Sequence, residues 1–189
     1  MNENILLMRK AKFLLAGQWM EAFVGSLIYT LLMAAASYIG FGEFIIGGSL
    51  TFGYFLYLTS LVDRRQSDYN LVFRGFNRFV ETLVAGLIYY LAIFVGAILL
   101  IVPGIIAYCG LSMTFYIMVD NPNISGLDAI KQSWEMMKGQ KWNFFCLQMR
   151  FFGWILLCVL TAGIGYIFLS PYMTVTNLNF YRKLRYGTF

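Results

Sequence analysis

The stretch from Leu83 to Val119 contains no charged residue, and it constrains the fold of this chain more than any other feature. As one helix it would be about 55 Å long, whereas the hydrocarbon core of a bilayer is about 30 Å thick. Proline removes a backbone donor and disfavours helix at the residue before it, and glycine permits a reversal. We therefore expect crossings over about 83–102 and 104–119, with a hairpin turn at Pro103 and Gly104. A single kinked helix is the alternative.

The composition also indicates a membrane protein. Hydrophobic residues make up 60% of the chain and charged residues 12%, whereas soluble domains average about 25% charged residues. A soluble core of this size could not hide so much apolar surface. The net charge of +5 does not indicate a nucleic-acid partner, because the basic residues lie in short clusters at the ends of apolar runs.

The rest of the chain has the same pattern on either side of this hairpin. We predict an all-α membrane protein, a single transmembrane domain over 1–189 with six transmembrane helices arranged as three hairpins. The spans are expected at about 17–39, 44–62, 83–102, 104–119, 142–160 and 164–180. Amphipathic interfacial helices are expected before spans 1 and 5, at about 1–16 and 124–138. The connector before span 3 is partly amphipathic.

The distribution of positive charge predicts the topology. Of the 14 Lys and Arg, all except Arg150 fall in the N-terminal helix, the 63–79 and 120–141 connectors or the C-terminal tail. By the positive-inside rule these segments and both termini are cytoplasmic. The resulting cationic rim predicts contacts with anionic lipid headgroups, worth about 1 kcal/mol for each well-placed Lys or Arg.

One pattern precedes each hairpin: an amphipathic segment, a glycine and an aromatic residue. Its members are Gly17 with Trp19, Gly75 with Phe79, and Gly139 with Trp142. Glycine would break the surface helix, and the aromatic ring would anchor the turn at headgroup depth. The pattern predicts an internal repeat. The alternative is that every such elbow needs these residues, and for the middle copy the two interpretations are equally supported. Trp134 joins Trp19 and Trp142 as an expected interfacial anchor.

Several short motifs carry a family likeness. They are Ile-Val-Pro103-Gly104-Ile-Ile, Asp120-Asn-Pro-Asn-Ile-Ser, Ala129-Ile-Lys-Gln-Ser133, Phe152-Gly-Trp154, Thr161-Ala-Gly163-Ile-Gly165 and Phe180-Tyr181-Arg182. Together they resemble the bacterial integral-membrane family catalogued as domain of unknown function 975, over most of the chain and best from Gly75 onward. The resemblance implies a six-helix protein of the bacterial cytoplasmic (inner) membrane. It implies no activity, substrate or catalytic residue.

Two charged residues lie inside the predicted spans. Glu21 and Arg150 each lie nine residues beyond a cytoplasmic lysine, which places both about 13 Å along their helices. An unpaired charge at that depth costs at least about 2.5–3.5 kcal/mol. We therefore expect Glu21 and Arg150 to form a buried polar pair that joins the first and last hairpins. A structural contact, or snorkelling of Arg150, is favoured over an ion or substrate pathway.

A polar face is expected on span 6. Ser170, Thr174, Asn177 and Tyr181 fall on one side of a helix. Such side chains can line a polar cavity or hydrogen-bond to neighbouring helices, and the second interpretation is favoured.

The inventory of reactive groups argues against an enzyme. The chain has no histidine, its three cysteines lack metal-site spacing, and it has neither a clear carboxylate pair nor a phosphate loop. We expect no catalytic residue, metal or cofactor. Two function classes remain. The favoured class is a non-catalytic membrane protein that binds lipid or scaffolds a protein partner, including a second copy. The other is a small channel or transporter with a polar site near Glu21 and Arg150.

Overall fold

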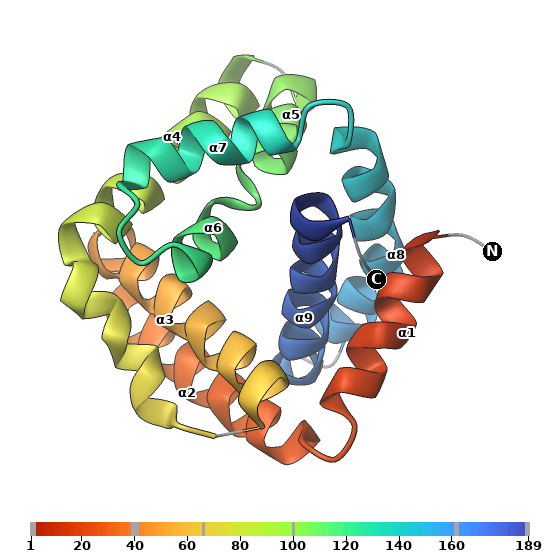
Figure 1. Cartoon of the computed structure of the whole chain (residues 1–189). Coiled ribbons are helices and arrows are strands. Elements are labelled where there is room, and N and C mark those ends of the chain that lie inside the picture. The colour runs from red at the N-terminus through yellow and green to blue at the C-terminus, as the bar shows by residue number, and fades with distance from the viewer. Residues whose placement is uncertain (1–2, 39–41, 66, 100, 161–162, 188–189) are drawn as a thin grey trace.

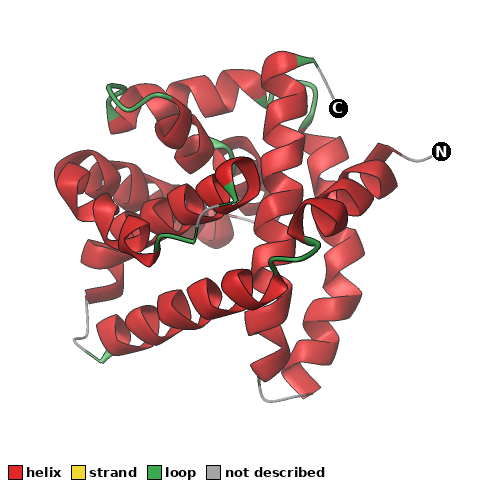
Figure 2. Cartoon of the chain, turned by 60° about the horizontal axis from the view of Figure 1, so that its bottom comes forward, coloured by secondary structure: helices red, strands yellow, loops and turns green. Residues whose placement is uncertain are grey.

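A computed structural model describes residues 3–38, 42–65, 67–99, 101–160 and 163–187. These residues are helical apart from short connections, and they contain no β-strand (Figure 2), which confirms the predicted all-α class for this part of the chain. The elements are α1 (Glu3–Leu15), α2 (Trp19–Ser37), α3 (Gly42–Arg64), the 3₁₀ segment η1 (Tyr69–Arg78), α4 (Phe79–Leu99), α5 (Ile101–Leu111), α6 (Thr114–Asp120), α7 (Gly126–Met136), α8 (Lys141–Leu160) and α9 (Ile164–Tyr186). Residues 1–2, 39 and 100, which belong to the predicted first interfacial helix, span 1 and span 3, lie outside the described residues.

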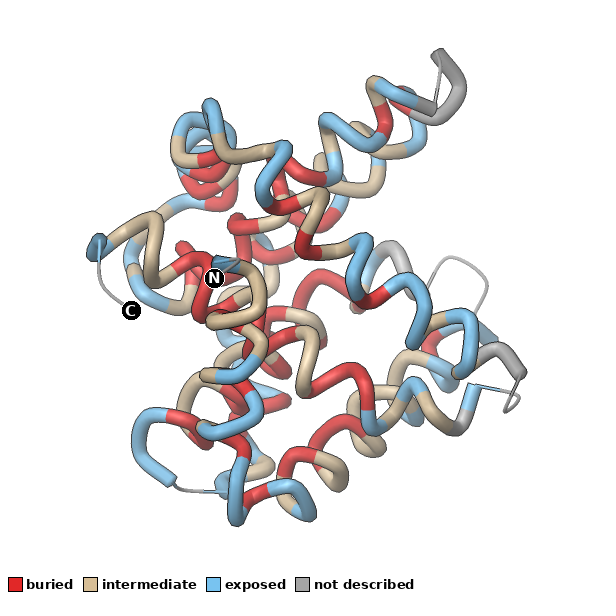
Figure 3. The backbone as a smooth tube through the Cα atoms, turned by 90° about the vertical axis from the view of Figure 1, so that its right-hand side faces the viewer, coloured by how far each residue is buried: buried red, intermediate tan, exposed pale blue. Residues whose placement is uncertain are grey.

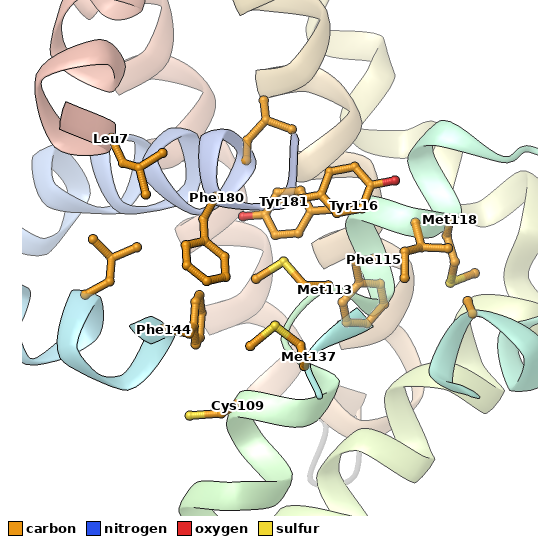
Figure 4. Packing of buried hydrophobic residues seen from close by; sticks show 14 of the residues in the cluster. Leu7, Cys109, Met113, Phe115, Tyr116, Met118, Met137, Phe144, Phe180 and Tyr181 are labelled. Carbon is orange, nitrogen blue, oxygen red and sulfur yellow. The ribbon is translucent and has the colours of Figure 1, made fainter. Parts of the chain in front are cut away.

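Helix α9 lies in the middle of the molecule (Figure 1) and contacts α1, α2, α3 and α8. Its Phe180 and Tyr181 are buried in the larger hydrophobic cluster, where they meet Phe144 of α8 and the side chains of α6 (Figure 4). A second cluster joins α1, α2, α3 and η1. Buried stretches of the chain face the inside of this arrangement, and the exposed stretches lie toward its periphery (Figure 3). The two clusters position the polar and cationic groups described below.

Several helices are apolar enough to lie in a membrane. Among the described residues, four helical segments are long and apolar enough to cross a bilayer: Trp19–Ser37, Ile45–Arg64, Tyr69–Gly96 and Val102–Asp120. Large apolar side chains stay exposed on the outer faces of the helices, including Leu31, Phe94 and Leu156 at 61%, 64% and 59%. Such surfaces are costly in water and suited to hydrocarbon. The predicted spans 142–160 and 164–180 form α8 and α9, which are not among these four segments.

The predicted hairpin turn at Pro103 and Gly104 is wrong in position. Helix α4 ends at Leu99 and α5 begins at Ile101, so both residues lie in the first turn of α5. Proline is tolerated there because the N–H it lacks would have no helical partner. Gly104 serves close packing instead, because a Cβ at Gly96 of α4 would lie 2.7 Å from the Gly104 Cα.

The predicted span 104–119 is also not one continuous helix. It is divided into α5 and α6 by a break at Ser112 and Met113. Ser133 of α7 bridges this break, since its buried Oγ donates to the Gly110 carbonyl oxygen at 2.8 Å and accepts from the Met113 N–H at 3.2 Å. A buried backbone break needs such partners, and this one comes from a residue 20 positions downstream.

Ser133→Ala should therefore lower the free energy of unfolding by about 1–2 kcal/mol, because two buried backbone groups lose their partner. Chemical unfolding in mixed micelles measures the change. Ser37→Ala is the matched control, since the exposed Ser37 hydroxyl bonds only within its own helix, to the Ala34 carbonyl oxygen. Equal stability of the two variants would contradict the bridging role.

The two predicted interfacial helices bury their inner faces against protein. Helix α1 packs Leu7, Ala11 and Leu15 inward and contacts α9. Helix α7 turns Gly126, Ala129 and Ser133 inward, whereas Trp134, an expected interfacial anchor, is 37% exposed. Small side chains occupy the inner face of α7 because they let α7 approach α4 closely. A Cβ at Gly126 would clash with the Glu81 carbonyl.

The glycines of the predicted repeat do not behave alike. Gly17 and Gly139 have φ of +83° and +75°, a left-handed conformation that glycine adopts without strain, and each ends a helical segment before an elbow. Gly75 instead packs against α3, where a Cβ would lie 2.7 Å from the Ser49 carbonyl carbon. The middle copy thus uses its glycine for close approach, and the repeat itself stays a prediction.

Candidate functional site

The structure does not bring Glu21 and Arg150 together, and this corrects the expected buried pair. Glu21 lies half-buried in the first turn of α2, where its backbone carbonyl accepts from the Tyr57 hydroxyl at 2.8 Å. Arg150 lies on an exposed face of α8. Within the described parts of the chain no ion pair joins them. Two residues at equal depth along their helices need not face each other, because depth does not fix the direction of a side chain around the helix axis.

An apolar groove lies between the elements that carry these two residues. It is about 370 Å³ in volume and is lined by Trp19, Trp154, Leu157, Cys158, Gly165, Phe168, Leu169 and Tyr172. Trp19 thus faces the middle of α9, with its ring centroid 6.4 Å from that of Tyr172. The polar site near Glu21 and Arg150 that a channel or transporter would use is not assembled.

The predicted polar face of α9 contacts several helices. The Tyr54 and Ser170 hydroxyls lie 3.0 Å apart, Asn177 accepts from the Gln148 amide at 3.3 Å, and the Tyr181 hydroxyl donates to Asp120 at 2.8 Å. At Thr174 the backbone carbonyl, rather than the side chain, accepts from the Tyr116 hydroxyl at 3.0 Å. These bonds tie α9 to α3, α8 and α6.

The C-terminal turn of α9 forms a cluster of ion pairs that the sequence analysis did not foresee. Arg182 pairs with Asp63 at 2.6 Å, Arg185 with Asp120 at 3.6 Å, and Lys183 with Glu3. Each acid comes from a different element, so the C-terminal cluster gathers the ends of α1, α3 and α6 around α9. The three cations at 182, 183 and 185 are visible in the sequence, where they predict contacts with lipid headgroups. These three cations are instead paired within the protein.

Lys141 differs from these cations. It opens α8 directly after the Gly139 elbow, and its Nζ lies 3.3 Å from the centroid of the Trp134 ring. Desolvation by burial lowers the pKa of Lys141. Lys138 is paired with Glu135 at 2.6 Å, whereas no described acid pairs with Lys141. A cation stacked on an aromatic ring is held in place while it keeps its capacity to bind an anion.

The Lys141 ammonium lies beside a second apolar groove, called here the α5/α8 groove. Its volume is about 350 Å³, and its lining is Val102, Ile105, Ile106, Cys109, Lys141, Trp142 and Phe145. Trp142 is 71% exposed, as expected of a ring at a membrane interface. One cation in the lining of an otherwise apolar groove suits a ligand with an anionic head and a hydrocarbon tail.

The described residues contain no group of three or more Cys, Asp or Glu side chains that could hold a metal ion. The α5/α8 groove itself offers one ammonium and one thiol as its chemical groups, which suits binding more than catalysis.

A family model described as "Protein of unknown function (DUF975)" matches residues 97–187. No curated protein and no solved structure matches the chain.

Proposed function

We propose that this protein, whose residues 97–187 match the DUF975 family model, is a non-catalytic membrane protein that binds anionic phospholipid in the α5/α8 groove. The matched segment holds all the residues that line this groove. The lipid phosphate would bind the Lys141 ammonium. One acyl chain would lie along Ile105, Ile106 and Phe145. The observation that carries the proposal is a cation without a described acidic partner in the lining of an otherwise apolar groove.

The proposal includes an orientation in the membrane. The ion pairs of the C-terminal cluster bring the ends of α1, α3, α6 and α9 together. With the concentration of Lys and Arg in these segments, this supports a cytoplasmic location for that end, including both termini. The protein would then be a multi-pass protein of the bacterial inner membrane, with α8 and α9 as its fifth and sixth spans. The exposed apolar faces would also permit a protein partner or a second copy.

Lipid retention by the purified protein tests the proposal. Native mass spectrometry in mild detergent would compare phosphatidylglycerol with phosphatidylcholine of the same acyl chains. Lys141→Gln should weaken phosphatidylglycerol binding about fivefold, because one well-placed lysine contributes about 1 kcal/mol. Phosphatidylcholine binding should change less.

Two further variants make this test specific. Lys138→Gln is the matched control, since Lys138 is already paired with Glu135, and it should leave phosphatidylglycerol binding unchanged. Ile106→Trp should weaken the binding of both lipids by filling the α5/α8 groove. If Lys141→Gln binds phosphatidylglycerol as the unaltered protein does, or if Lys138→Gln loses as much, the proposed site is rejected and partner binding becomes the better account.

A further inference from the structure

A cavity of about 120 Å³ lies among the helices, separate from both grooves. Aromatic rings from five helices line it, among them Phe55, Tyr89, Tyr108, Phe115 and Phe144. Figure 4 shows Phe115 and Phe144 pointing toward the interior from α6 and α8. We call this space the tyrosine cavity. From it we infer that the protein binds a small neutral aromatic compound with a hydroxyl or similar hydrogen-bonding group, for which phenol is the model.

The size of the tyrosine cavity fits one six-membered ring. An engineered apolar cavity of about 150 Å³ stays dry and binds benzene, and the space here is of the same order. Ring walls also favour an aromatic occupant, because offset and edge-to-face contacts are worth more than area burial alone. A lipid chain or a peptide would be too large.

The lining of the tyrosine cavity favours an uncharged ligand. The lining side chains are apolar, aromatic, hydroxyl or amide groups, and none is charged. An ion transferred to such a site would lose its hydration without gaining a countercharge, so a charged ligand is strongly disfavoured. A neutral ligand carries no such cost.

Two polar side chains can orient a hydroxyl group. The Ser112 hydroxyl donates its proton to the Cys109 carbonyl oxygen at 2.8 Å, which leaves the lone pairs of its oxygen to accept a bond. The Asn177 carbonyl oxygen accepts from Gln148 at 3.3 Å, and its amide nitrogen keeps two donors. A phenol hydroxyl could donate to Ser112 and accept from Asn177.

One side chain borders both the tyrosine cavity and the outer face of α4. Tyr90 of α4 lines the tyrosine cavity and also an open apolar hollow of about 240 Å³ that it shares with Leu87, Leu91 and Phe94. The same side chain thus borders the interior and the outer face of α4. A compound that partitions into lipid would enter beside Tyr90. This inference does not rest on the α5/α8 groove.

Fluorine NMR of para-fluorophenol added to the protein in lipid nanodiscs tests the inference, with empty nanodiscs giving the lipid-partitioned signal. We expect a saturable bound resonance that unlabelled phenol displaces and that benzoate does not. Ser112→Leu, which fills the space, should remove the resonance. Asn177→Leu should weaken binding by up to about tenfold, the worth of one hydrogen bond.

Controls separate this site from the lipid site and from misfolding. Ser37→Leu, the same substitution at an exposed serine of α2, and Lys141→Gln should both leave the resonance intact. Each variant is compared only if its melting temperature shows that it is folded. The inference is overturned if no saturable resonance appears, if benzoate competes as well as phenol, or if folded Ser112→Leu and Asn177→Leu both bind like the unaltered protein.

Discussion

Replacing Gly53 with alanine is expected to prevent the native packing of α3 against η1. A Cβ at this position would lie 2.6 Å from the Val72 carbonyl carbon and closer still to its oxygen. The clashing atoms belong to the backbone, so no side-chain rotation relieves the contact. The only relief is a shift of η1 away from α3, which would open the second hydrophobic cluster. Overpacking usually costs about 1–3 kcal/mol, and this rigid contact should reach or exceed the upper value.

The measurement is the folded yield and melting temperature of the purified variants, followed by size-exclusion chromatography and tryptophan fluorescence. Gly153→Ala is the matched control, because Gly153 lies within α8 and a Cβ there would meet nothing within 4 Å. Alanine is about 1 kcal/mol better than glycine in a helix interior, so this control should fold as well as the unaltered protein or better. A Gly53→Ala variant that melts at the same temperature as Gly153→Ala would contradict the close-contact model.

This contact shows where sequence reasoning stops. Gly53 belongs to a run of small residues that indicates close helix packing. Its partner is the backbone of Val72, in a connector expected only to be partly amphipathic. Apolar runs do predict which segments are helical, and four of the described segments are long and apolar enough to cross a bilayer, which imposes length and backbone satisfaction directly. They do not predict which face meets protein, because lipid and protein neighbours both accept apolar side chains. On α7, for example, Gly126 lies close to the Glu81 carbonyl of α4, a contact that the apolar pattern does not indicate.

The sequence also does not predict the polar contacts between distant segments of the chain. The division between α5 and α6 depends on Ser133, and nothing near Ser112 indicates it. Lys141 could be recognised as a cation before a span, but the α5/α8 groove exists only because Ile105 and Phe145 come together. Helical spacing placed Glu21 and Arg150 at one depth and could not supply their direction around each helix axis.

The C-terminal cluster carries the second large expected effect. Asp120 Oδ2 accepts from the Tyr181 and Tyr186 hydroxyls at 2.8 Å each and lies 3.6 Å from Arg185 Nε. Burial and the hydrogen bond to Asp120 raise the pKa of Tyr181, so its hydroxyl stays a donor throughout the neutral range. One carboxylate therefore fastens the end of α6 to the last turn of α9.

Asp120→Asn should lower the free energy of unfolding by about 2–3 kcal/mol, because it removes the charge and replaces one acceptor by a donor. Chemical unfolding in mixed micelles measures the loss. Glu135→Gln is the control, since that carboxylate is 65% exposed and pairs with Lys138, three residues along the chain, a contact worth less than about 1 kcal/mol. A similar loss in both variants would show that the Asp120 contacts are ordinary surface pairs. A loss confined to Asp120→Asn would identify the Asp120 contacts as the link that holds the end of α6 to the C-terminal turn of α9.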